Sequence, residues 1–114
     1  MKGLRRWEIG LILGIMLILA GLAYAQFAYE SITVSSVAKT FTAATYGLGV
    51  RKAIVTCEDN NIRFTLDGTQ VPTSAGVGHL LYVGQTLTLD KYEIQNFKAV
   101  RASGTDATLK ITYY

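Results

Sequence analysis

The 114-residue sequence predicts an all-β antiparallel sandwich of seven or eight short strands, preceded by one N-terminal hydrophobic helix. Three observations predict this fold. Apolar and polar residues alternate with a period of two in most segments after residue 29. Turn residues separate these segments at spacings near ten residues. Finally, residues 9–25 are free of charge and follow a basic N-terminal head.

The uncharged run predicts an export segment, and two interpretations of it stay open. The basic head in front of the run consists of Lys2, Arg5 and Arg6. Together with a small-x-small sequence that ends at Ala25, this head is typical of a signal peptide cleaved before Gln26. Residues 9–29 also suffice for a retained anchor, because at about 1.5 Å per residue they give a helix of about 31 Å. Both interpretations divide the chain into an export segment, residues 1–28, and a β domain, residues 29–114.

We favour the retained anchor, with residues 9–29 in contact with membrane lipid. Lysine and arginine lie only on the N-terminal side of the apolar run, so the positive-inside rule places the N-terminus in the cytoplasm and the β domain outside. Gly10, Gly14 and Gly21 fall on one face of the helix, and such a stripe predicts close helix–helix contact. Glycine is also frequent in membrane helices that make no such contact.

After the export segment, the chain carries strand character in short stretches. Residues 69–78, with the only proline, Pro72, predict a loop or an edge. Residues 90–93 predict a polar connection and residues 103–106 a hairpin turn into the last strand. No helix is expected after residue 29. The expected strands are residues 31–36, 39–43, 52–57, 62–66, 79–83, 85–89, 94–101 and 107–114.

The apolar positions of these strands predict a modest core. About 89 residues follow the export segment, enough for one domain without a disulfide or a metal. Cys57 is the only cysteine, which excludes an internal disulfide, and its parity with Val55 predicts a buried, inert thiol. The expected core consists of Ile32, Val34, Phe41, Val55, Ile62, Phe64, Leu66, Leu81, Leu87, Leu89, Phe97, Leu109 and Ile111.

The charge of the chain argues against a nucleic-acid partner. The formal net charge is +3, but two of those three charges belong to the first 25 residues. No stripe of lysine and arginine interleaved with aromatic residues is present in the β domain. The basic character of the protein therefore belongs to the export segment.

The sequence offers little for catalysis or metal binding. His79 is the only histidine and no nucleophile motif accompanies it, so we expect a structural or surface role. One cysteine and one histidine cannot make a Cys/His metal site. Residues 58–61 (EDNN) carry oxygen ligands of the kind calcium uses, yet aspartate and asparagine also favour solvated turns. We expect no cofactor, no metal and no enzymatic activity.

The second half of the chain carries a set of turn and strand motifs. They are IRFTLDGT at 62–69, Pro72-Thr73, GHLL at 78–81 with Gly84, Ile94, Asn96-Phe97, Arg101 and LKITYY at 109–114. Over roughly residues 50–114 these motifs resemble small accessory proteins encoded among the structural genes of bacteriophages. The resemblance implies a decoration, neck or tail-associated β module without enzymatic activity. Such proteins usually lack an export segment, so this chain departs from the pattern in residues 1–30.

Taken together, the sequence predicts a non-enzymatic structural module, membrane-anchored or exported, that assembles into a larger array such as a phage particle or an extracellular filament. Its expected partners are copies of itself or other structural subunits, because edge strands readily accept a neighbour's strand. The alternative is a secreted cell-surface or carbohydrate-binding sandwich released after Ala25. That alternative needs exposed aromatic side chains, for which Tyr46, Tyr82 and Tyr92 are the candidates.

Overall fold

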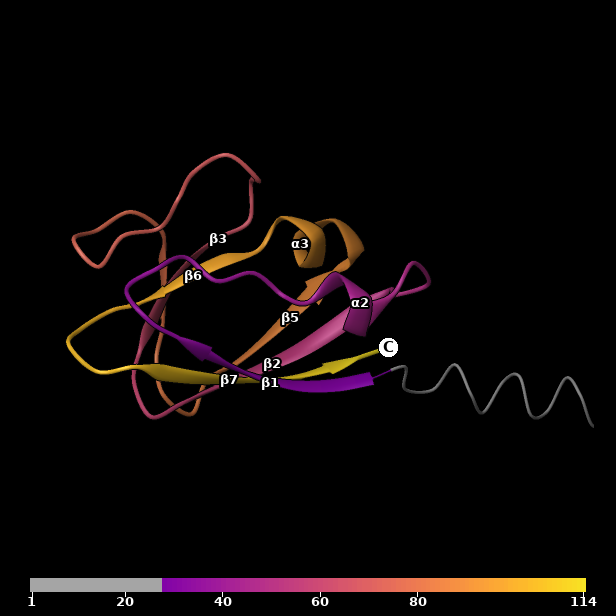
Figure 1. Ribbon diagram of the computed structural model, residues 1–114, viewed down its shortest axis with the longest axis horizontal. Coiled ribbons are helices and arrows are strands. Elements are labelled where there is room, and N and C mark those ends of the chain that lie inside the picture. Colours follow the sequence, from indigo (N-terminus) through magenta and orange to yellow (C-terminus); the bar gives the residue numbers. More distant parts are fainter. Residues whose placement is uncertain (1–27) are drawn as a thin grey trace, which may run out of the picture.

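The computed structural model describes residues 28–114, which form two antiparallel sheets with a few short helical turns (Figure 1). Sheet A has four strands in the order β1-β7-β2-β5, and sheet B has three in the order β4-β3-β6. The strands are β1 (Ala28–Val34), β2 (Lys52–Glu58), β3 (Ile62–Thr65), β4 (His79–Leu81), β5 (Thr86–Asp90), β6 (Lys98–Arg101) and β7 (Ala107–Tyr113). The helices are α2 (Ala43–Tyr46) and α3 (Lys91–Asn96). The antiparallel all-β prediction is thus confirmed, while the expected N-terminal helix lies outside the described residues.

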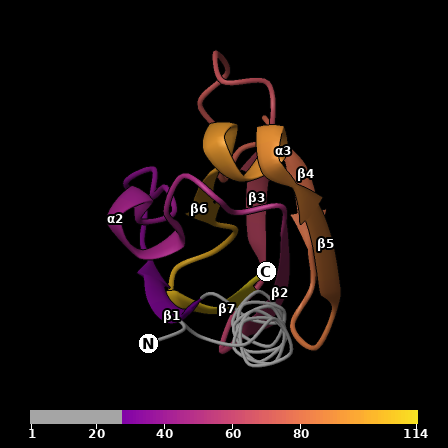
Figure 2. The same cartoon turned by 90° about the vertical axis from the view of Figure 1, so that its right-hand side faces the viewer.

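The central strand of sheet A is β7, which pairs with β1 on one side and β2 on the other. Every second residue of β7 is buried, from Ala107 to Tyr113, and the residues between them face away from the core. Because side chains alternate across a strand, this pattern places one face of sheet A inward and leaves the other to solvent. Figure 2 shows the two sheets as layers, with α2 beside β1.

The core lies between the two sheets and contains the predicted residues with few exceptions. Leu66 and Leu87 are only partly buried and pack against its rim, whereas the other predicted members are buried. The prediction missed several buried residues, of which Tyr113 is the largest. The missed core residues are Val50, Ala53, Ile94, Ala99, Ala107 and Tyr113, besides Cys57, whose burial was predicted.

The prediction of a helix-free domain was wrong at two places. Helix α3 begins with a capping box, in which Asp90 Oδ1 accepts a hydrogen bond from Glu93 N (2.8 Å) and Glu93 Oε1 accepts one from Asp90 N (3.0 Å). The expected strand at residues 94–101 is therefore shortened to β6. In the expected strand at residues 39–43, only Lys39 makes a β-bridge, and the chain then turns into α2.

The connections between strands often change sheets. After β1 the chain leaves sheet A and reaches the edge of sheet B, where Ser35 O accepts a hydrogen bond from Arg101 N (2.9 Å). Residues 103–106 join β6 of sheet B to β7 of sheet A, so the predicted hairpin turn is wrong. An ion pair between Arg101 and Asp106 (2.6 Å) closes this connection.

The long connection between β3 and β4 covers the outer face of sheet B. Three outward side chains of this sheet donate hydrogen bonds to its backbone carbonyls: Thr65 to Gln70 (2.7 Å), Arg63 to Gly78 (3.1 Å) and Lys98 to Gly68 (3.5 Å). Pro72, at its centre, is fully buried. The predicted loop at residues 69–78 is thus a lid fixed onto sheet B.

In the part of the chain that the structure describes, no helix has the length and apolar character needed to cross a membrane. The apolar run at residues 9–25, with Gly10, Gly14 and Gly21, lies outside the described residues.

Candidate functional site

A hollow of about 780 Å³ lies between α3 and the lid over sheet B. The ring of His79 lies against that of Phe64 at the edge of sheet B (centroids 5.6 Å apart), and Tyr92 on α3 is 62% exposed. The lining residues are Thr65, Leu66, Asp67, Gln70, Val77, Gly78, His79, Asp90, Tyr92 and Glu93. We call this hollow the α3 groove.

The carboxylates of the α3 groove already serve the local backbone. Asp67 Oδ1 accepts hydrogen bonds from Gln70 N (2.9 Å) and Thr69 N (3.0 Å), and these bonds lower the pKa of the Asp67 carboxyl. Asp90 and Glu93 form the capping box of α3. Among residues 28–114, no three histidine, cysteine, aspartate or glutamate side chains cluster as metal ligands would. The groove therefore offers hydrogen-bond acceptors and one aromatic ring rather than a metal centre.

The acidic turn at residues 58–61 ties neighbouring loops together. Asp59 Oδ2 accepts a hydrogen bond from Thr108 Oγ1 (2.6 Å). Asn60 donates to Thr105 O (2.6 Å), and Asn61 Oδ1 accepts from Val83 N (2.9 Å). The side chains that the sequence offers for calcium thus connect neighbouring loops at this end of the sandwich.

Cys57 is buried in sheet A, as predicted. Its Sγ donates to Asn60 O (3.0 Å), and burial raises the pKa of the thiol to about 11. Because the thiolate is the reactive form, this cysteine is unreactive at neutral pH.

The three candidate tyrosines do not form a common platform. Tyr46 packs against the buried Tyr113 ring (centroids 5.6 Å apart) and is only partly exposed. Tyr82 and Tyr92 are 50% and 62% exposed, but one precedes β5 and the other follows it. Since a five-residue strand is about 17 Å long, the two rings belong to opposite ends of the domain.

A half-buried network that the sequence did not predict joins β1, β7 and the N-cap of α2. Tyr113 Oη donates to Glu30 Oε2 (2.7 Å), and Thr42 Oγ1 donates to Glu30 Oε1 (2.8 Å). Burial and the Glu30 carboxylate together raise the pKa of the Tyr113 phenol. The burial of Tyr113 could have been predicted, because it continues the alternation of Leu109 and Ile111. Nothing in the sequence around Tyr113 indicates its hydrogen bond to Glu30.

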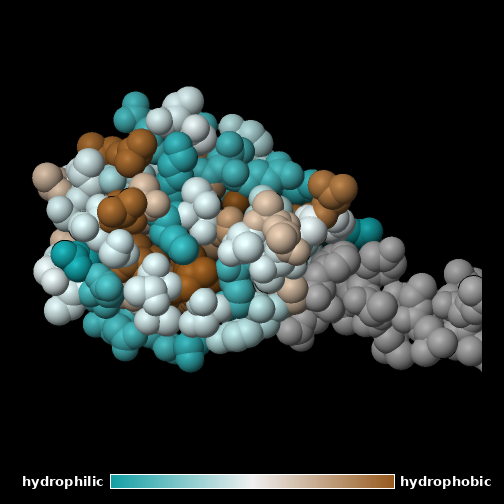
Figure 3. Space-filling model, in the orientation of Figure 1, coloured by the Kyte–Doolittle hydropathy of each residue, from teal (hydrophilic) through white to brown (hydrophobic). Residues whose placement is uncertain are grey.

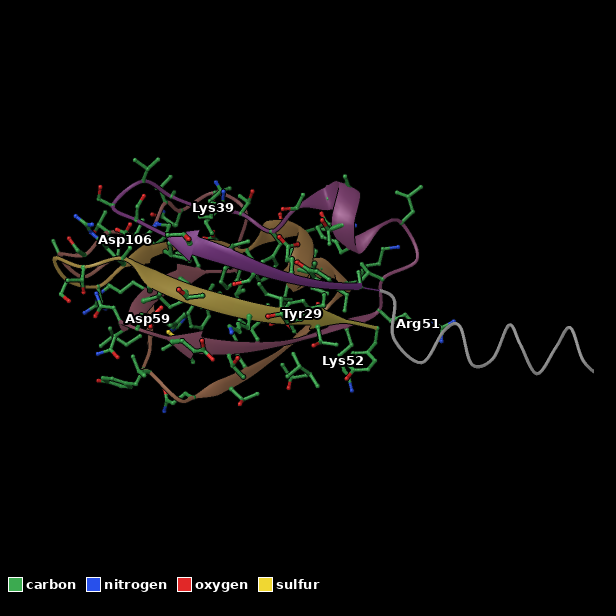
Figure 4. All side chains as sticks on the ribbon, turned by 60° about the horizontal axis from the view of Figure 1, so that its bottom comes forward. Tyr29, Lys39, Arg51, Lys52, Asp59 and Asp106 are labelled. Carbon is green, nitrogen blue, oxygen red and sulfur yellow. The ribbon has the colours of Figure 1, made fainter. Side chains whose placement is uncertain are left out.

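The outer face of sheet A is bare and rich in hydroxyl groups. Its charged side chains include Lys110 and Glu58, which form one ion pair of 3.5 Å. Tyr29 lies on the same face, in one row with Thr112, Ile54 and Thr88 (Figure 4). The hydroxyl side chains of this face are Ser31, Thr33, Thr56, Thr86, Thr88, Thr108 and Thr112.

Both edges of sheet A are unpaired within residues 28–114. β1 and β5 each pair on one side only, and β1 is seven residues long. Natural edge strands are commonly protected by charged side chains, especially lysine, by proline, by a bulge or by a covering helix, and of these devices β1 has one acidic residue, Glu30, and the neighbouring α2. The sequences of β1 (AYESITV) and β5 (TLTLD) contain neither lysine nor proline.

Comparison with known proteins gives this chain no relatives: no family model, no curated protein and no solved structure matches it.

Proposed function

We propose that this protein is a non-enzymatic structural module, anchored in a membrane by its N-terminal segment, whose exported β domains join into an array through the edges of sheet A. The observation that carries the proposal is the seven-residue edge of β1, which is unpaired among the described residues and has no lysine or proline. Such an edge presents a row of free backbone N–H and C=O groups to a neighbouring strand.

The strand directions of sheet A suit a continuous array. Each neighbouring pair in the order β1-β7-β2-β5 is antiparallel, so β1 and β5 run in opposite directions. A second copy placed beside the first, without being turned end over end, sets its β1 antiparallel to the first copy's β5. All copies then keep Ala28 on the same side, as anchors in one membrane require. Such a head-to-tail contact builds a ring where the rotation between copies closes and a filament where it does not.

The setting that we propose for the array is a phage particle with a membrane or an extracellular filament. The motifs in residues 50–114 support a virion-like module, and the uncharged run at residues 9–25 supports assembly at or beyond a membrane. The bare outer face of sheet A, in contrast to the covered face of sheet B, leaves room for neighbours.

The test is the oligomeric state of the full-length protein in mild detergent, measured by light scattering and by cross-linking. We expect oligomers for the natural chain and loss of oligomers for the double variant Ser31→Lys, Thr33→Lys, because lysine on an edge strand discourages pairing. The control is Thr112→Lys, which adds a single lysine to the inner strand β7 and should keep the oligomers. A monomeric natural chain contradicts the proposal.

The α3 groove favours a second candidate function, carbohydrate binding by a secreted domain. Tyr92 borders this groove beside hydrogen-bonding side chains such as Gln70 and Asp67, an arrangement that suits a sugar ring stacked on an aromatic face. This candidate requires a mature chain that begins at Gln26, which intact mass measurement decides. Binding on a glycan array should then be lost in Tyr92→Ala and kept in Tyr82→Ala, since Tyr82 lies at the other end of β5.

A further inference from the structure

One loop holds an apolar side chain fully in solvent. Leu48 lies between two glycines in the connection from α2 to β2 and is 92% exposed. Gly47 ends α2 at φ 70°, a left-handed conformation that favours glycine, and so turns the loop outward. Figure 3 shows hydrophobic groups projecting from an otherwise polar surface, one of them at the right-hand end of the domain.

Basic groups surround this loop. Lys91 Nζ donates a hydrogen bond to Leu48 O (2.9 Å), and the exposed Arg51 and Lys52 follow the loop at the start of β2. Lys52 Nζ also lies 5.1 Å from the centre of the Tyr114 ring. The acidic residues at this end, Asp90 and Glu93, are engaged in the capping box of α3.

The opposite end of the sandwich has a different character. Figure 4 shows Asp59 and Asp106 at one end of sheet A and Arg51 and Lys52 at the other. Asp106 pairs with Arg101, and Asp59 accepts a hydrogen bond from Thr108. Arg51, Lys52 and Lys91 thus lie at the end of the domain that carries Leu48, together with Asp90 and Glu93, while Lys39 lies toward the other end (Figure 4).

This is also the end at which the chain enters the domain. Ala28, the first residue of β1, lies in one row with Tyr113 of β7 and Ala53 of β2, and Ala53 follows Lys52 in the chain. The apolar run ends at Ala25, two residues before β1, and the predicted anchor over residues 9–29 is wrong at its end, because Ala28 and Tyr29 belong to the strand. At about 3.5 Å per residue, the connection from the run to β1 spans at most about 10 Å. An anchor at residues 9–25 thus holds the Leu48 end of the domain against the bilayer.

We propose that Leu48, with Arg51, Lys52 and Lys91, forms a contact site for an anionic lipid surface. The Leu48 side chain inserts at the boundary between headgroups and acyl chains, and the three cations bind anionic headgroups around it. This inference rests on the anchored form in the proposed function and does not depend on assembly through β1. The contact fixes the tilt of the domain, so that the edges of sheet A stand upright and meet those of neighbouring copies.

The test places an environment-sensitive fluorophore on a new cysteine in the full-length protein. Cys57 is buried and unreactive, so Leu48→Cys is labelled selectively with nitrobenzoxadiazole. The labelled chain is reconstituted into vesicles of three parts phosphatidylcholine and one part phosphatidylglycerol. We expect a blue-shifted emission that spin labels on the lipid headgroups quench. The same fluorophore at Val37→Cys, a matched control, should remain solvent-like, because Val37 is 72% exposed but follows the far end of β1.

The outcomes separate this inference from the proposed function. Equal quenching at both positions, or none at position 48 in a chain shown by intact mass to retain residues 1–25, overturns the lipid contact. The double variant Arg51→Gln, Lys52→Gln should weaken quenching at position 48 in these vesicles and leave it unchanged in pure phosphatidylcholine. An identical loss in both vesicles contradicts the role of the cations. Assembly is measured separately by cross-linking, so a monomeric chain that is quenched at position 48 contradicts assembly alone.

Discussion

The two sheets of this domain differ in what the polar side chains on their outer faces contact. Sheet B has three short strands, and its outward side chains Arg63, Thr65 and Lys98 bind the backbone of the lid that crosses them. Sheet A has four longer strands, and no other segment of residues 28–114 is bonded across its outer face, which is rich in threonine and serine. One sheet satisfies its polar groups within the chain, and the other presents them to its surroundings.

The difference between the two outer faces indicates which part of the molecule is available for contact. The edge of sheet B next to β6 is also occupied, since Lys39 and Ser35 bond to β6 there. In sheet A the edges of β1 and β5 are unpaired among the described residues. We therefore propose that sheet B supports the fold and that sheet A makes the contacts between copies.

The largest expected effect is at the aromatic stack that joins the sheets. Phe97 lies between Phe41 (centroids 4.1 Å apart) and Phe64 of sheet B (5.8 Å), and is buried. We expect Phe97→Ala to lower the free energy of unfolding by about 3–5 kcal/mol, because it leaves a large cavity. Urea unfolding measures the loss, and Val37→Ala, at an exposed position, serves as the control.

Hydrogen exchange on the same variant tests whether the two sheets are one cooperative unit. We expect amide protection to fall in both sheets, since the stack contacts Tyr113 of sheet A through Phe41 (centroids 6.0 Å apart) as well as Phe64 of sheet B. Loss of protection in sheet B alone contradicts this coupling and means that sheet A is stable by itself.

Strands were predictable from the sequence where apolar and polar residues alternate regularly. The assignment of each strand to one of the two sheets was not predictable. Residues 107–114 alternate so regularly that their strand follows from the sequence alone. Whether the turn at residues 103–106 returns the chain to the same sheet depends on packing between distant segments. The local sequence carries no information on this packing. Helix α3 was missed although Asp90 and Glu93 have the spacing of a capping box, because six residues are too few for a helical period to emerge.

A second prediction concerns the lid alone. Gly78 has φ 101°, and a Cβ there would lie 2.8 Å from the backbone oxygen of Phe64. We expect Gly78→Ala to cost about 1–3 kcal/mol through strain and this clash. Gly76→Ala is the matched control, because Gly76 also has a positive φ (141°) but no atom within 4 Å of its added Cβ. Urea unfolding of both variants measures the difference.

The location of the Gly78→Ala effect tests whether the lid acts mainly on sheet B. Hydrogen exchange should rise most in the lid and in β4, and the protein should keep its oligomeric state. Disruption of the oligomers in a folded Gly78→Ala protein would show that the lid, not sheet A, makes the contact.

A third prediction concerns the buried hydroxyl of Tyr113 in sheet A. Tyr113→Phe removes the hydrogen bond to Glu30, and we expect a loss of about 1–2 kcal/mol, as for other bonds to charged groups. Fluorescence-detected urea unfolding at neutral pH measures it. Thr42 still donates to Glu30 in the variant, which limits the loss.

The same variant has a distinctive pH dependence. In the native protein the pKa of Tyr113 is raised, so above about pH 10 the unfolded chain releases this proton while the native chain retains it. The stability that the neutral phenol contributes is complete below that pH and is lost as the pH rises. We expect a steeper alkaline loss in the natural chain than in Tyr113→Phe. Cys57, whose pKa is also raised, acts in the same direction in both proteins and cancels in the difference.

The candidate site was less predictable than the fold, for a physical reason. The α3 groove brings Asp67 next to Glu93, and the Glu30 network brings β1 next to the last residues of β7. Both depend on tertiary packing. The sequence did offer Tyr46, Tyr82 and Tyr92 as candidate exposed rings, and Tyr82 and Tyr92 are exposed while Tyr46 is partly buried. It could not indicate that β5 separates Tyr82 from Tyr92, since this depends on the direction of the strand.

The smallest expected effect lies at the centre of the bare face. Lys110 on β7 forms an exposed pair with Glu58 at 3.5 Å, and such pairs contribute little to folding. We therefore expect Lys110→Ala to change the free energy of unfolding by less than about 0.5 kcal/mol, measured by urea unfolding. If neighbours join edge to edge, the oligomers persist as well, because Lys110 lies on the face and not at an edge. A folded Lys110→Ala protein without oligomers would move the contact from the edges of sheet A to its threonine face, where stacked sheets rather than continuous ones build the array.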